Sequence, residues 1–388
     1  AELEEKISRG PGINDLVAYG YRVNPGLQAA RSAWAAEVAR YRLETGYPDP
    51  QLNVTYFPEP IETRLGPQDW NLSLSQTIPF PGKLSTAGEI VASDARLARL
   101  ELDKAVRDLT VALRESYHEL LYIQEGQRIA RENMELLAHL RKIGETAYGQ
   151  EQAALIDVTK AQSQSAQLRY DLLLLEELEQ TEKARLNALL NRAPEAAVGP
   201  LRRRDLQPVA LELETIYELA ADNREEIKMA AARVEKAKAR KALATYQFLP
   251  DFRVGLFYAE IGEPEVPVLP QEAGRDAVGV QFGLSLPLWF GKNKGRLDQA
   301  RAETARAKSL RTAQINDTKA EVRELFFRLQ NARRLVELYG RELLPRAART
   351  LELAETWYQT GQGSFSDFIE TQATWYNFQL ALARSPAD

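Results

Sequence analysis

Two short segments of the chain carry the same polar residues in the same order. Tyr148 and Asp157 recur as Tyr358 and Asp367, at an offset of 210 residues, with small residues between them. Each aspartate follows a turn and precedes apolar residues, a position typical of a helix cap or a first-turn charge. Gly361 and Gly363 suit the geometry of the second turn. The chemistry of these segments is therefore hydrogen bonding and charge, with both tyrosines free to pack at the turn.

The rest of the chain offers little for catalysis or for metal binding. Cysteine is absent, which excludes disulfides, iron–sulfur clusters and thiol catalysis, and only His118 and His139 could supply imidazole. We find no Ser/His/Asp or phosphate-binding pattern, so we expect no enzyme activity, no cofactor and no metal site. Lys and Arg number 50 against 55 Asp and Glu, a balance that does not favour nucleic acid.

The repeated turns belong to a longer internal duplication. Pro48-Asp49-Pro50 returns as Pro250-Asp251-Phe252, and Phe80-Pro81-Gly82-Lys83 returns as Trp289-Phe290-Gly291-Lys292. A unit this long is no solenoid repeat, whose period is about 20–50 residues. We therefore predict a first repeat over residues 1–198, a linker over 199–214 and a second repeat over 215–388.

Each repeat is expected to contain a long antiparallel helical hairpin. Residues 83–143 lack proline and are rich in Ala, Leu, Glu and Arg, and residues 292–356 are similar except for Pro345, which should kink or break the helix. Returning helices are expected over 155–191 and 365–383, with tips at about 144–157 and 356–367. No apolar run approaches the ~18 residues of a membrane-spanning helix.

A two-residue period precedes each long helix. Leu52, Val54 and Tyr56 alternate with polar residues, and Val278, Val280 and Phe282 alternate with small or polar ones. This period predicts β-hairpins over about 50–78 and 251–287, joined by loops over 58–68 and 262–275. A soluble hairpin with one buried face would give the same pattern. Isolated hairpins are marginally stable, however, and closing a barrel from several chains would leave no free edge.

The order and spacing of these segments resemble the TolC-like outer-membrane efflux family over nearly the whole chain. The resemblance rests on Asn24-Pro25-Gly26-Leu27, on the junctions at Pro48, Pro79, Pro250 and Leu288, and on the Tyr358–Asp367 turn. It implies an α+β membrane protein. Three chains would form a helical tunnel and share a 12-stranded transmembrane β-barrel, with four strands from each chain.

The resemblance also implies partners and a gate. The homotrimer would lie in the outer membrane of a Gram-negative bacterium, in contact with outer-membrane lipid. It would work with a periplasmic adaptor and an inner-membrane pump. The likeness of residues 77–83 to the heavy-metal-efflux branch implies a pump of the resistance–nodulation–division type. The alternative is a soluble periplasmic coiled-coil scaffold or adaptor.

In the family, a tyrosine and an arginine of the second tip hold an aspartate of the first tip and close the channel. The resemblance places these roles on Tyr358, on Gly363, where the arginine is missing, and on Asp157. Asp367 and Glu370 match positions at which acidic residues ring the lumen and favour cations. The predicted tip turns also include Tyr148, Gly149, Glu151 and Gly361.

Overall fold

The computed structural model describes residues 2–149, 155–202, 212–360 and 362–388. Its fifteen elements follow the chain in the order α1 (Glu2–Arg9), α2 (Ile13–Val23), α3 (Pro25–Thr45), β1 (Gln51–Thr63), β2 (Gly66–Ile78), α4 (Lys83–Gly149), α5 (Leu155–Leu189), α6 (Leu213–Asn223), α7 (Glu225–Tyr246), β3 (Asp251–Ala259), β4 (Ala277–Ser285), α8 (Phe290–Glu337), η1 (Leu338–Leu343), α9 (Leu344–Gln359) and α10 (Phe365–Arg384).

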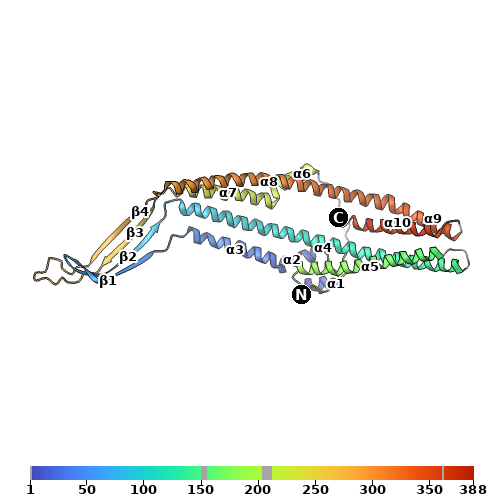
Figure 1. Cartoon of the computed structure of the whole chain (residues 1–388), viewed down its shortest axis with the longest axis horizontal. Helices are drawn as coiled ribbons and strands as arrows, with labels where there is room; N and C mark the ends of the chain where they lie inside the picture. The colour runs from blue at the N-terminus through green and yellow to red at the C-terminus, as the bar shows by residue number, and fades with distance from the viewer. Residues whose placement is uncertain (1, 150–154, 203–211, 361) are drawn as a thin grey trace. The chain divides into compact units, whose positions relative to one another are not determined.

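The long helices agree with the prediction. Helix α4 has 67 residues and no proline, so its series of backbone hydrogen bonds is uninterrupted over a helix length of about 100 Å. Helices α5 and α10 return from the two tips, as expected (Figure 1). None of the described helices combines the length and the apolar character needed to cross a membrane.

The predicted break near Pro345 takes the form of a π-helical turn. Element η1 separates α8 from α9, and the Leu344 amide donates to the carbonyl of Tyr339, five residues earlier. Arg114-Glu115 matches Arg323-Glu324 at an offset of 209 residues, whereas Glu145-Thr146 matches Glu355-Thr356 at 210. The second copy therefore holds one extra residue. The wider π turn accommodates this residue, so the buried face of α9 keeps the orientation of the corresponding face in the first copy.

The four strands form one antiparallel sheet in the order β1-β2-β3-β4 (Figure 1). The predicted loop over residues 58–68 is wrong, because β1 and β2 continue to Thr63 and Gly66 and leave a two-residue turn. The β1–β2 register shifts between Tyr56 and Ile61, where Pro58 and Pro60 cannot donate to the ladder. Reading these prolines as strand breakers caused the error.

The register places nearly all apolar strand residues on one face of the sheet. Paired residues form four rows across it: Leu52, Leu74, Leu256 and Val280; Val54, Leu72, Tyr258 and Val278; Gln76, Val254 and Phe282; Ile78, Phe252 and Leu284. The opposite face holds mainly Asn, Ser, Thr, Gln, Gly and Ala. The apolar face is not covered in the chain, since Val278 is 78% and Phe282 82% exposed.

The chain divides into two compact units. One comprises residues 1–29, 103–221 and 317–388, and the other comprises residues 30–102 and 222–316. The sheet lies in the second unit. The first unit contains the helical tips and a core of buried residues from α4, α5, α9 and α10. Each compact unit draws on both halves of the sequence, so the duplication does not correspond to two separate globules.

Candidate functional site

The turn between α9 and α10 is built around the backbone of Trp357. Its carbonyl accepts from the amides of Gln362 at 2.8 Å and Gly363 at 3.1 Å, which folds the chain back after α9 ends. Ser364 then caps α10, because its hydroxyl accepts from the amide of Asp367 at 3.1 Å. Asp367 is therefore a first-turn charge and the cap is Ser364, three residues earlier, a distinction that the sequence prediction had left open.

The tyrosine of the second tip packs within the core of the first unit. The Tyr358 ring lies 5.1 Å from the Phe365 ring and 6.5 Å from the Phe368 ring, measured between centroids. Both phenylalanines are 1% exposed. Packing of Tyr358, one of the two roles expected from the sequence, is therefore observed, and it fixes the position of this tyrosine at the turn.

The acidic residues of the second tip face away from this core. Asp367 and Glu370 are three residues apart on α10, so they share one face of the helix, and both are exposed. The buried face of the same helix carries Phe365, Phe368, Ile369, Gln372 and Tyr376. Helix α10 thus has one buried face and one exposed face, and the exposed face carries two neighbouring carboxylates.

Gly363 lies at the position where the sequence resemblance led us to expect an arginine. A Cβ atom at this position would lie 3.0 Å from the Trp357 Cβ and 3.4 Å from the Trp357 carbonyl carbon. A side chain would therefore force the turn to move by a few tenths of an ångström. The tight return of the chain over Trp357 explains why glycine stands here.

The first tip is described only in part. Tyr148 and Gly149 lie in the last turn of α4, and Asp157 is the third residue of α5; their side chains lie outside the description. Glu151 and Gly361 lie outside the described residues altogether. A contact between Tyr358 and Asp157 therefore stays a prediction.

A buried polar cluster near the tips was not predicted. Asn133 of α4 and Gln372 of α10 are both 0% exposed, and the Gln372 amide donates to Asn133 Oδ1 at 2.8 Å. Asn133 in turn donates to Gln379 Oε1 at 2.9 Å and to the carbonyl of Ile129 at 2.8 Å. The only signal in the sequence is that Gln372 repeats Gln162, which is exposed.

Two further contacts join α5 to α10. Lys160 donates to the hydroxyl of Ser366, and the Tyr376 hydroxyl donates to Asp171 Oδ2 at 3.2 Å. Burial, and then the charge of Asp171, raises the pKa of Tyr376 far above its usual range, so this hydroxyl stays protonated and donating. Polar contacts thus complement the apolar core between the two helical hairpins.

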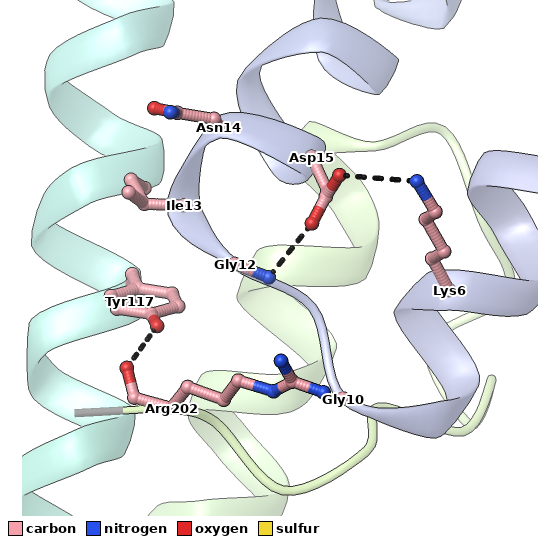
Figure 2. A pocket seen from close by; sticks show the side chains of 8 residues that line it. All are labelled: Lys6, Gly10, Gly12, Ile13, Asn14, Asp15, Tyr117 and Arg202. Atoms are coloured by element: carbon pink, nitrogen blue, oxygen red, sulfur yellow. Dashed lines mark hydrogen bonds and ion pairs between the residues drawn. The ribbon is translucent and has the colours of Figure 1, made fainter. Parts of the chain in front are cut away.

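A pocket of about 590 Å³ lies where α1 and α2 meet α4 in the first unit (Figure 2). Asp15 accepts from the Gly12 amide at 3.0 Å and lies 3.9 Å from Lys6 Nζ, and the Tyr117 hydroxyl donates to the carbonyl of Arg202 at 2.6 Å. These groups hold the N-terminal segment and the segment after α5 in place, and we assign no ligand to the pocket. Across the described residues, no cluster of His, Cys, Asp and Glu is arranged to hold a metal ion.

Comparison with known proteins identifies a matching family model and several solved structures with a similar fold. Residues 216–386 match the family model described as outer membrane efflux protein. The structure is similar to the outer membrane protein VceC of Vibrio cholerae, at 21% identity over 97% of this chain and 92% of that chain, with a TM-score of 0.77. It is also similar to CusC, at 16% identity over 98% and 90% of the two chains, with a TM-score of 0.79.

A third similar structure is the CmeC outer membrane channel of Campylobacter jejuni. It has 14% identity over 97% of this chain and 82% of that chain, with a TM-score of 0.76. No curated protein matches the sequence. Identities this low show a shared fold, so the chain has the fold of these outer-membrane proteins.

Proposed function

We propose that the chain is a TolC-like outer-membrane efflux protein, and that three copies form the exit duct of a tripartite pump. The duct passively conducts substrates delivered by an inner-membrane transporter from the periplasm to the outside. Each copy supplies four strands to a shared barrel and its helices to a periplasmic tunnel. Binding and conduction, with no covalent chemistry, are the whole of this activity.

The observation that carries the proposal is the sheet with one apolar face and two open edges. Strands of 13, 13, 9 and 9 residues are long enough, when tilted, to cross most or all of a bilayer's apolar core. Apolar side chains on one face and small or polar ones on the other suit lipid outside and water inside. Open edges at β1 and β4 cannot remain unpaired in lipid, because each unpaired backbone group there costs several kcal/mol.

The helical tips would form the periplasmic gate. We assign its contacts to Tyr358 and Asp157, as the family resemblance suggests, with Gly363 in place of the usual arginine. The packing of Tyr358 on Phe365 and Phe368 supports a defined position for the tyrosine. Asp367 and Glu370, each present three times in a trimer, would make the aperture favour cations. Tyr148, Gly149, Glu151 and Gly361 complete the two turns.

The partners belong to the same proposal. A duct that ends in the periplasm needs an adaptor and an inner-membrane pump, and we propose a pump of the resistance–nodulation–division type. The likeness of residues 77–83 to the heavy-metal-efflux branch points to metal ions ahead of drugs as cargo.

Fractionation of cells that export the chain to the periplasm tests the proposal against a soluble scaffold or adaptor. A duct pellets with the outer membrane and leaves it only in detergent, because its apolar sheet face needs lipid. Arg301→Asp on α8, an exposed helix position, serves as the matched control for Phe282→Asp on the sheet face. We expect Phe282→Asp alone to reduce membrane recovery. A chain found as a soluble monomer without detergent would rule out the duct.

A further inference from the structure

An ion pair joins the first strand-to-helix junction to the strand that follows it in the sheet. Lys83, the first residue of α4, is 9% exposed, and its Nζ donates to Asp251 Oδ1 at 2.7 Å and to the carbonyl of Leu249 at 3.0 Å. The Phe80 amide donates to the same Asp251 oxygen at 2.8 Å. Asp251 therefore ties the end of β2 and the start of α4 to the start of β3.

The second junction has the same residues but no such contact within the chain. Lys292 repeats Lys83, and Asp49 repeats Asp251. Both Lys292 and Asp49 are exposed, and neither forms an ion pair with any described residue. The chain thus contains two lysine–aspartate sets of this kind. Lys83 and Asp251 form an ion pair within the chain, which we call the closed pair, whereas Lys292 and Asp49 do not, and we call them the open pair.

The open pair lies at the two free edges of the sheet. Asp49 precedes β1 and Lys292 follows β4, and these strands are the outer members of the order β1-β2-β3-β4. In the closed pair, Lys83 follows β2 and Asp251 begins β3, which are hydrogen-bonded neighbours. The repeat therefore implies that β4 pairs with a β1 strand, and only another copy of the chain has one to offer.

The register of a seam between β4 of one copy and β1 of the next can be derived from the β2–β3 register within the chain. Ile78 opposes Phe252 in the β2–β3 pair. Pro79 repeats as Pro287, an offset of 208, and Pro250 repeats as Pro48, an offset of 202. The same pairing then sets Leu286 opposite Pro50, Leu284 opposite Leu52 and Phe282 opposite Val54. Each of these pairs keeps apolar residues on one face, whereas a shift by one residue would not.

We propose that Lys292 of one copy binds Asp49 of the next copy, and that this ion pair closes the β4–β1 seam in the register just given. It reproduces between copies the contact that Lys83 and Asp251 make within one. Closing the seam buries the pair against the neighbouring junction, where screening by solvent is weaker than at an open surface. The proposal rests on the proposed function, since it needs copies that assemble in a ring.

Cysteine cross-linking tests the register, and the natural absence of cysteine makes it clean. Paired residues of adjacent antiparallel strands have Cβ atoms about 4.5–5.5 Å apart, within reach of a disulfide. Leu52→Cys with Leu284→Cys should give covalent dimers and trimers on oxidation of the full chain in detergent. Leu52→Cys with Gly283→Cys, whose side chains would lie on opposite faces, should give none.

Charge reversal tests the ion pair in the same full-length protein. Lys292→Glu and Asp49→Lys should each lower by several degrees the temperature at which trimers dissociate in detergent, and the double variant should restore it. Lys294→Glu, an exposed lysine on the same helix, should leave it unchanged. Single variants that dissociate like the wild type, or a double variant that is weaker than either, would overturn the ion pair.

The outcomes separate this inference from the proposed function. Trimers that form, but in which Leu52→Cys cross-links with Gly283→Cys and not with Leu284→Cys, would overturn the register and leave the duct intact. A chain that forms no oligomer in detergent or lipid would overturn both.

Discussion

At the residue scale, the buried amides of Asn133 and Gln372 specify how α4 and α10 pack. An amide inside an apolar core is costly unless it is hydrogen-bonded, so only the register that pairs these two groups is favourable. Asn133 lies one helical turn from Ile129 and from Leu137, and Gln372 lies one turn from Phe368, near the start of α10 after the second tip. The relative position of the helices at the tip is therefore set partly by two polar groups.

Removing one partner of this pair should destabilise the first compact unit. Asn133→Ala leaves the Gln372 amide without its acceptor, and we expect a loss of about 1–3 kcal/mol in the free energy of unfolding. Denaturant titration of the helical circular dichroism signal measures it. The double variant Asn133→Leu with Gln372→Leu should recover most of the loss, and Gln162→Leu, at the exposed counterpart of Gln372, should cost less than about 0.5 kcal/mol. Equal losses for Gln162→Leu and Asn133→Ala would argue against a specific pair.

The gate makes its own prediction at this scale. If the contact between Tyr358 and Asp157 keeps the tips together, Asp157→Ala and Tyr358→Phe should each raise the single-channel conductance in planar bilayers. Tyr358→Phe retains the ring that packs on Phe365 and Phe368, so its effect would isolate the hydroxyl. Arg301→Ala, in the other compact unit, is the control. A conductance that stays at the wild-type value in both tip variants removes the gate assignment.

At the element scale, helices and strands differ in how far the sequence determines them. Helices α4, α5 and α10 follow from long runs of helix formers with a period of 3.6 residues and no proline. The end of β1 does not, because Pro58 and Pro60 look like breakers and only the bulge in the paired strand accommodates them. Asn133 was missed for a similar reason, since a lone asparagine within a helix reads as a surface residue until its partner 239 residues away is known.

The π-helical turn gives a prediction about single-residue deletions. Deleting Gly340 from η1 should bring the residues after η1 back to the offset of 209 seen in α8 and keep the same faces buried, with Pro345 still interrupting one backbone hydrogen bond. Deleting Ala313 from the middle of α8 should instead rotate everything that follows by about 100° around the helix axis. Thermal unfolding followed by circular dichroism should show a small change for the first deletion and a large loss for the second. Similar losses for both would show that the extra residue does not reside in η1.

At the scale of the whole molecule, the proposed assembly gives the duplication a role. Each chain has one closed junction, at Lys83 and Asp251, and one open junction, at Asp49 and Lys292. Each chain also has two helical tips and two free sheet edges. In the proposed assembly, a ring of three copies would close every junction and edge and would place six tips around one opening, so each open junction would gain a partner.

Single-channel recording from the purified full chain in a planar bilayer tests the central claim most directly. The duct predicts stepwise insertion of trimers, each adding one conductance level, with a preference for cations over anions because of Asp367 and Glu370. A detergent-free monomer that leaves the bilayer silent at every protein concentration would contradict it.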